Sequence, residues 1–343
     1  MNYNEFKQSV VENFSSYLSE RYQSAEVVVK PTNKVNRQVD GIVLMNIDGL
    51  PNASPTIYVN DMYEQYLETE NFDEVMEKAA GTMEHAIEEF PEVARIGVMD
   101  FDSLKDNVVL TLINAESNKE LLKTVPHRTF EDLAIVYRWY LKHDDQGIYS
   151  NLVNNDLAER VGMTEEQLYK AAVENTSRIF PPTVRNMNEV ITEMIFGDDI
   201  MDLEMKEEFD GFVNEIPDDR SLFVISNEAK IYGAAAILND DRLYELSEKL
   251  GSDLYILPSS VHECIAVSAN YGSPEELAEM VHEINMAEVD VADRLSNQVY
   301  HYDRDERKLR LATDTQYKTI DDKVAENGMQ YDQDRESGKQ DKR

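Results

Sequence analysis

The residues best suited to chemistry lie together in one short segment, Pro258–Cys264. Ser259 and Ser260 follow the proline, and His262 and Glu263 come directly after them. A serine, a histidine and a carboxylate are the groups that acyl transfer requires, so Ser260, His262 and Glu263 are the candidate catalytic residues. Serines after a proline are also common turn formers whose hydroxyls bind backbone amides, and the sequence favours that simpler interpretation.

The same segment could supply metal ligands. Successive residues on a strand point to opposite faces, so at most His262 and Cys264 could share one metal ion. A histidine bonded to the backbone near a turn is the favoured interpretation, and neither a metal nor a cofactor is predicted. Cys264 is the only cysteine. It rules out an intramolecular disulfide, and on an apolar strand it is typical of a small buried hydrophobic residue.

Several common catalytic motifs are missing from the sequence. The 13 glycines are too widely spaced for the dinucleotide-binding, phosphate-binding and nucleophile-elbow motifs, each of which needs two glycines within about five positions. The six histidines are also far apart, so no zinc-protease motif occurs. Whether the chain is an enzyme therefore stays open.

The pattern of apolar residues predicts an α+β protein with two subdomains, mixed sheets flanked by helices, and a disordered C-terminal tail. Residues 1–124 open with an amphipathic helix over 4–21, and helices over 60–68 and 72–90 follow strands. Residues 125–312 begin with a hairpin whose strands are 132–141 and 148–153. An alternation of strands and helices follows, and the polar residues 313–343 form the predicted tail.

Two residues near the hairpin, Trp139 and Tyr140, could form a ligand-stacking surface. On a strand, core and cross-strand packing is the favoured role for them. The capping box Thr164-Glu-Glu-Gln167 predicts the start of a helix that the Pro181-Pro182 pair ends. Two negative stretches stand out, residues 60–93 and 189–220, and the second is expected to contain a short surface helix.

Charge is the strongest compositional feature, because 68 acidic residues against 33 basic ones leave a formal net charge of −35. Direct binding to nucleic acid or to an anionic membrane is disfavoured, since both need a cationic face. The simplest interpretation is that the charge keeps the protein in solution. No apolar run is long enough to cross a bilayer and the first residues do not resemble a signal peptide, so a cytoplasmic location is expected.

Four sequence blocks, Thr56–Asn60, Val125–Arg138, Asp253–Val267 and Leu295–Arg304, carry a resemblance to a known family. They resemble an uncharacterised family of Gram-positive gut anaerobes, domain of unknown function 5688, and Asn175–Pro182 also fits its pattern. The resemblance implies no catalytic residues. It does suggest an association with mobile or accessory genetic elements.

Three hypotheses follow. The favoured one is a non-catalytic interaction protein whose acidic faces engage a basic or DNA-binding protein, in a sharper form by imitating the phosphates of nucleic acid. The alternative is an enzyme of unfamiliar type with a site around Ser260, His262 and Glu263. A scaffold that assembles into a stable oligomer is the third, and the sequence leaves the oligomeric state open.

Overall fold

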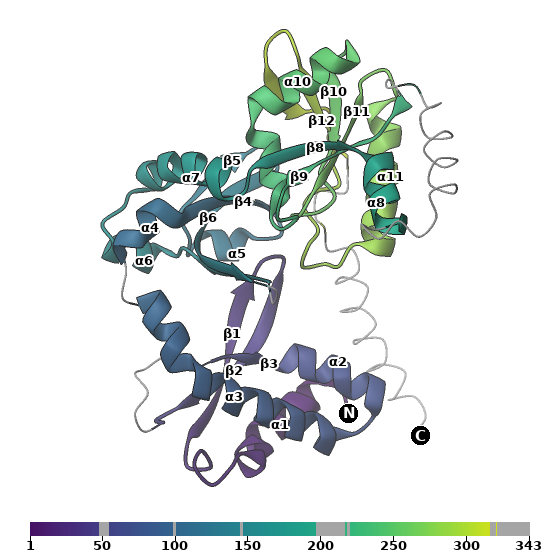
Figure 1. Ribbon diagram of the computed structural model, residues 1–343. Helices are drawn as coiled ribbons and strands as arrows, with labels where there is room; N and C mark the ends of the chain where they lie inside the picture. The colour runs from purple at the N-terminus through teal and green to yellow at the C-terminus, as the bar shows by residue number, and fades with distance from the viewer. Residues whose placement is uncertain are drawn as a thin grey trace, which may run out of the picture. The chain divides into compact units, whose positions relative to one another are not determined.

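The chain folds into two compact units, Met1–Phe101 and Asp102–Arg343 (Figure 1). The computed structural model describes residues 1–47, 55–98, 101–144, 147–196, 217, 220–315 and 320. The sequence placed the division after residue 124, whereas the structure divides the chain after Phe101. The physical reason is β4, Val108–Asn114, which pairs residue by residue with β6, Leu133–Asp144, and so belongs to a sheet of the second unit.

The N-terminal unit combines helices with a three-stranded antiparallel sheet of order β1-β2-β3. Its elements are α1 (Tyr3–Tyr17), β1 (Glu26–Lys34), β2 (Arg37–Met45), β3 (Ile57–Tyr58), α2 (Val59–Thr69) and α3 (Phe72–Val98). A capping box between Asn2 and Glu5 starts α1, and the predicted apolar face of this helix is buried at Phe6, Val10 and Phe14. These side chains pack against α2, α3 and the sheet in one hydrophobic core.

The start of α2 differs from the sequence prediction. The sequence predicts this helix from residue 60, whereas it begins at Val59 with Tyr58 at the cap position, where no side-chain hydrogen bond caps the helix. The Oδ1 atom of Asn60 instead accepts hydrogen bonds from the Asp40 amide at 2.8 Å and the Tyr3 hydroxyl at 3.1 Å. Asn60 therefore joins three elements of the unit rather than starting one helix.

The C-terminal unit contains two antiparallel sheets. In the first, the strand order is β4-β6-β5. Strand β7 pairs with the second part of β6, from Arg138 onward, which confirms the predicted hairpin. The elements of this half are α4 (Phe101–Asn107), β4, α5 (Lys119–Leu122), β5 (His127–Phe130), β6, β7 (Gly147–Leu152), α6 (Asn155–Arg160) and α7 (Glu165–Ile179).

The second sheet has six strands in the order β13-β12-β10-β11-β9-β8. Its half of the unit contains β8 (Pro182–Asn186), α8 (Met187–Phe196), β9 (Phe223–Asn227), the 3₁₀ helix η2 (Gly233–Leu238), α10 (Asp240–Leu250), β10 (Leu254–Leu257), β11 (Cys264–Ser268), α11 (Pro274–Glu288), β12 (Tyr300–Asp303) and β13 (Lys308–Leu311). Buried residues of α10 and α11 pack into different hydrophobic clusters, so the two helices contribute to separate cores.

The predicted α+β class is confirmed, but every strand pair among the described residues is antiparallel, so the expected mixed sheets are not found. The connection from β9 through α10 to β10 explains the difference. These strands run in the same direction, as the alternation of strand and helix predicted, but β11 lies between them and is antiparallel to both. The predicted tail and the predicted short helix over 200–213 lie outside the described residues, apart from a few positions at 313–315 and 320.

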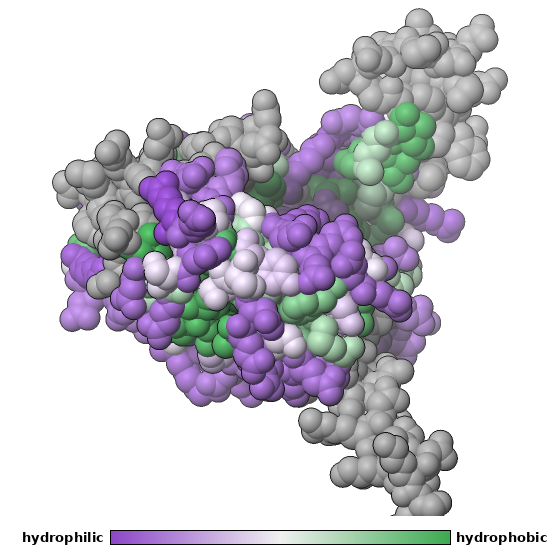
Figure 2. Space-filling view, turned by 90° about the horizontal axis from the view of Figure 1, so that it is seen from below, coloured by the Kyte–Doolittle hydropathy of each residue, from purple (hydrophilic) through white to green (hydrophobic). Residues whose placement is uncertain are grey.

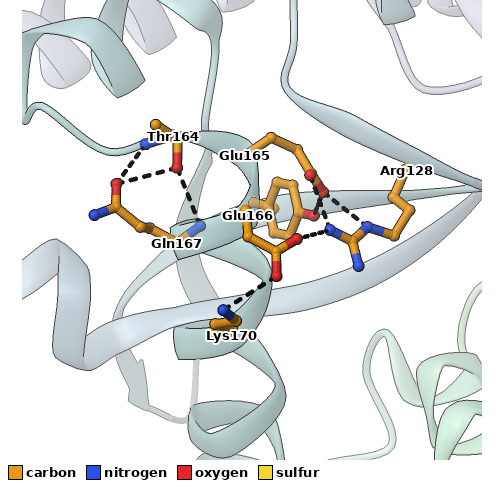
Figure 3. A network of polar contacts seen from close by, with 7 residues as sticks. Arg128, Thr164, Glu165, Glu166, Gln167 and Lys170 are labelled. Atoms are coloured by element: carbon orange, nitrogen blue, oxygen red, sulfur yellow. Dashed lines mark hydrogen bonds and ion pairs between the residues drawn. The ribbon is translucent and has the colours of Figure 1, made fainter.

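Helix α7 is fixed to the first sheet by a polar network (Figure 3). The predicted capping box forms between Thr164 and Gln167. Arg128 of β5 donates to both carboxylate oxygens of Glu165, at 3.1 and 3.0 Å, and the hydroxyl of the fully buried Tyr137 donates to the same carboxylate. Burial alone would raise the pKa of Glu165, but the hydrogen bonds from Arg128 and Tyr137 outweigh it and lower that pKa.

A helix that crosses a bilayer contains about 20 predominantly apolar residues. No helix in the described part of the chain is both long enough and apolar enough for this.

Candidate functional site

His262 lies in the turn between β10 and β11, and both nitrogens of its ring are engaged. Nδ1 accepts a hydrogen bond from the Tyr232 amide at 3.3 Å, and Nε2 lies 3.3 Å from an oxygen of Asp293. Because Nδ1 is the acceptor, the proton of the neutral ring is assigned to Nε2, which donates to Asp293. Neither nitrogen is left to act as a general base.

The other two candidate catalytic residues do not complete a triad. The hydroxyl oxygen of Ser260 accepts the His262 amide at 3.0 Å, a local turn contact of the kind that the sequence favoured. Glu263 is exposed. The carboxylate that the structure brings to the His262 ring is Asp293, which sequence reasoning missed because it lies far along the chain with no motif to mark it.

Cys264 is fully buried on β11. Burial, and to a smaller extent the charge of Glu263, raise the pKa of its thiol well above the ordinary value, so the reactive thiolate is disfavoured. No group of three or more histidine, cysteine or acidic side chains in the described part of the chain is arranged to hold a metal ion. The segment 258–264 therefore has the geometry of a firmly held turn.

The aromatic pair of the hairpin also has a packing role. Trp139 is 2% exposed within the core of the C-terminal unit. The Tyr140 ring packs edge-on against Phe180, with the ring centres 5.4 Å apart. The core packing that the sequence favoured is confirmed for Trp139, whereas the contact of Tyr140 is with Phe180 at the end of α7.

The first acidic stretch falls on α2 and α3, and the acidic side chains described up to Glu88 are exposed or half-buried. Helix α3 buries Val75, Met76 and Met83, and the opposite side carries exposed acidic residues. At 100° per residue, four glutamates share an arc of about 80° on that side. They are the exposed Glu74, Glu77 and Glu88 and the half-buried Glu84. Figure 2 shows hydrophilic residues over most of the described surface in that view, with smaller hydrophobic areas between them.

No lysine or arginine of the described residues forms an ion pair with any of these four glutamates. Two amides do approach them, the Asn71 side chain at 3.1 Å from Glu74 and the Ser19 backbone at 2.5 Å from Glu84. In the C-terminal unit, some acidic side chains have arginine partners, although the exposed glutamates of α11 form no ion pair among the described residues. Examples of the pairs are Glu193 with Arg185 at 2.5 Å and Glu248 with Arg304 at 2.8 Å.

The second acidic stretch can be followed only in part. Residues 189–196, 217 and 220 are described, and within them Glu193 is paired with Arg185 and with Lys230 at 3.6 Å. Its other described carboxylate, Glu189, lies in the first turn of α8. The unpaired acidic face on α3 is accordingly the stronger candidate for a functional surface.

Comparisons with known proteins identify a family but no activity. No curated protein and no solved structure is similar enough to match the chain. The model of a family of unknown function, DUF5688, matches residues 3–304, a span that runs through both units and includes the acidic helices and the His262 turn. The chain belongs to this family of unknown function.

Proposed function

We propose that this protein is a non-catalytic interaction protein that uses the exposed face of α3, together with the acids of α2, to bind a basic surface of a partner. The observation that carries the proposal is the row of four glutamates on α3 without a lysine or arginine partner among the described residues. Unpaired like charges on one face create a negative potential that attracts and orients a cationic partner. Carboxylates that serve only local stability would be expected to have paired neighbours.

The spacing of these charges bears on the sharper form of the proposal, in which the acids imitate nucleic acid. With a rise of about 1.5 Å per residue, Glu74 and Glu88 are separated by about 21 Å along the helix. A DNA strand carries a phosphate about every 3.4 Å, so it would place about six charges over that length where α3 places four. The match needs additional carboxylates from α2, such as the exposed Glu64 and Glu68.

The partner class follows from the same charges. A DNA-binding enzyme of a mobile element, in the cytoplasm of a Gram-positive gut anaerobe, presents a cationic groove of the required kind. Direct contact with nucleic acid or with an anionic membrane is not proposed, because the net charge of −35 opposes both.

An enzyme centred on Ser260, His262 and Glu263 is the less supported function. Both ring nitrogens of His262 are bonded to groups of other segments, the Tyr232 amide and the Asp293 carboxylate, and the Ser260 hydroxyl is bonded to a backbone amide. A general base needs a free nitrogen within reach of its proton donor.

The experiment is a pull-down with the tagged full chain from a lysate of a plausible host, washed at low and then at moderate salt. The test variant carries glutamine in place of four α3 acids: Glu74, Glu77, Glu84 and Glu88. The control variant carries glutamine in place of four exposed acids of α11: Glu275, Glu279, Glu283 and Glu288. Both variants change the net charge by the same amount but on different helices, and glutamine keeps a side-chain oxygen that can accept the hydrogen bonds from Asn71 and Ser19.

We expect a basic protein to be recovered with the wild type and the α11 variant, and lost with the α3 variant. The bound protein should also be released as salt rises, because salt screens exposed charges beyond about 10 Å at 0.1 M. Equal loss with both variants would show that total charge, not the α3 face, is responsible. Retained binding by the α3 variant would contradict the proposal directly.

A further inference from the structure

The C-terminal unit contains a pocket of about 110 Å³, and its lining includes no residue of the acidic helices α2 and α3. It lies where α7, β4, β9 and η2 meet, and its apolar wall includes Leu110, Phe180 and Ala236. Val173 is 40% exposed and marks the part of the lining that reaches solvent. No aspartate, glutamate, lysine, arginine or histidine lines this pocket.

Three polar side chains of the lining have unused hydrogen-bonding groups. Asn227 is 5% exposed, its amide nitrogen donates to the Ile231 carbonyl at 2.9 Å, and its carbonyl oxygen is buried without a hydrogen bond from any described residue. The hydroxyls of Tyr169 and Tyr232, which also line the pocket, have no hydrogen bond to the described residues either. The Asn227 oxygen is a buried group without a partner among the described residues, and the half-exposed tyrosines add two further hydrogen-bonding groups to the same lining, so the pocket offers polar contacts to a ligand.

The Tyr232 wall is held in a strained backbone conformation. Lys230 and Tyr232 have φ angles of 56° and 54°, in the left-handed region that non-glycine residues rarely adopt. The Tyr232 amide is held by His262, and an added Cβ at the next residue, Gly233, would lie 2.5 Å from the His262 carbonyl oxygen. Strain that the surroundings enforce in this way is characteristic of ligand-binding loops.

The ring of Tyr232 is fixed as well as its backbone. The ring of His262 stacks on it with centres 5.9 Å apart, and the guanidinium of Arg138 lies 4.7 Å from its centre. This arrangement gives His262 a positioning role. It holds one wall of the pocket in place, which a preformed binding site requires.

We infer that this pocket binds a small uncharged molecule that combines a ring with a hydroxyl or amide group. Its volume is comparable with the roughly 150 Å³ cavity that accommodates benzene in another protein, and it is far below the roughly 300–1,000 Å³ of cofactor sites. The uncharged lining and the net charge of −35 disfavour an anionic ligand. The hydroxyls of Tyr169 and Tyr232 form hydrogen bonds with the polar group of the ligand. After a small displacement of the Asn227 side chain, its carbonyl oxygen accepts a hydrogen bond from the ligand.

Phenol is the probe for the test, with benzene and benzoate as comparisons. In the full chain with ¹³C-labelled methyl groups, phenol should shift the resonances of the pocket residues Leu110, Val173 and Ala236. Methyl groups of Val267 and Val281, which lie in the separate core under α11, should stay unchanged. Phenol should bind at least tenfold more tightly than benzoate and more tightly than benzene.

Val173→Trp obstructs the pocket at an exposed helix position, so the fold should tolerate it. The matched control is Val11→Trp on α1 of the N-terminal unit, where the valine is 41% exposed and is not part of the pocket lining. We expect phenol affinity to fall at least tenfold in the first variant and to stay at the wild-type value in the second. Wild-type affinity in Val173→Trp, or equal binding of phenol and benzoate, would overturn the inference. Equal binding of phenol and benzene would overturn the part assigned to the polar groups.

Discussion

The attachment of α7 to the first sheet gives the sharpest test of the fold, through Tyr137 and Glu165. Tyr137 has no exposed surface, and its hydroxyl donates to the Glu165 carboxylate that Arg128 also binds (Figure 3). The perturbation is Glu165→Ala, compared with Tyr137→Phe and with the double variant. Each single change removes the same hydrogen bond but leaves a different group behind.

The expected magnitudes follow from what is left unpaired. In Glu165→Ala the buried Tyr137 hydroxyl has lost its acceptor, which costs about 1–3 kcal/mol of the free energy of unfolding. In Tyr137→Phe the carboxylate keeps Arg128 and is about one-third exposed, so the loss is about 1 kcal/mol. In the double variant no hydroxyl is left unpaired. Adding Tyr137→Phe to Glu165→Ala should therefore cost nothing further, or even restore part of the stability.

Urea unfolding monitored by tryptophan fluorescence is the suitable assay, because Trp139 is the only tryptophan and lies in the core of the C-terminal unit. Glu166→Ala is the control, since Glu166 binds Arg128 from an exposed position and its loss should leave the unfolding midpoint almost unchanged. If Tyr137→Phe costs as much in the Glu165→Ala background as in the wild type, the buried hydroxyl is not the source of the effect and the reasoning is refuted.

Three further predictions concern single residues. Gly233→Ala should lower the unfolding midpoint strongly, because the new Cβ would lie 2.5 Å from a carbonyl oxygen. At Gly81 a new Cβ would meet no atom within 4 Å, so Gly81→Ala should raise the free energy of unfolding by about 0.5–1 kcal/mol. Similar effects of the two variants in chemical denaturation would contradict this prediction. His262→Ala should destabilise the C-terminal unit, since its ring joins Tyr232 to Asp293, and an unchanged thermal midpoint would instead restore a catalytic role. Burial raises the pKa of Asp132 in the folded state. The contribution of Asp132 to the free energy of unfolding is therefore complete below the ordinary aspartate pKa and is lost as pH rises through the raised value. Across that range the free energy of unfolding should fall more for the wild type than for Asp132→Asn, and parallel curves for the two proteins would contradict this prediction.

Local signals in the sequence were sufficient for most helices of the fold. Thr164 and Gln167 form the predicted capping box, and Pro274 occupies the first turn of α11 behind the Ser273 cap. These features depend only on residues within about one helical turn of each other, so they can be predicted from a short stretch of sequence. The predicted hairpin of β6 and β7 is local in the same sense.

Features that depend on distant partners were not predictable. The Pro181-Pro182 pair was interpreted only as the end of a helix, yet Pro182 begins β8. Proline is tolerated there because β8 is the edge strand of its sheet, and edge position is a property of the whole sheet. The insertion of β11 between β9 and β10 is equally non-local, and it changed the expected mixed sheet into an antiparallel one.

The candidate site shows the same limit. The sequence placed Ser260, His262 and Glu263 side by side, but neighbouring residues in a turn point in different directions. The ring of His262 found its partners in Tyr232 and Asp293, from two other segments of the unit. Residue types alone therefore allowed acyl-transfer chemistry beside the favoured turn role, while the hydrogen bonds around the ring indicate a positioning role.

The distribution of charge separates a solubilising role from an interaction role. A charge that only keeps a protein in solution acts through its total, so its position does not matter. An interaction surface acts through position, because potential and geometry at one face select the partner. Arginines such as Arg185 and Arg304 neutralise nearby acids of the C-terminal unit, whereas the α3 glutamates, like those of α11, form no ion pair with a lysine or arginine among the described residues. Since the α3 and α11 variants remove the same charge from different faces, only an interaction surface predicts that they behave differently.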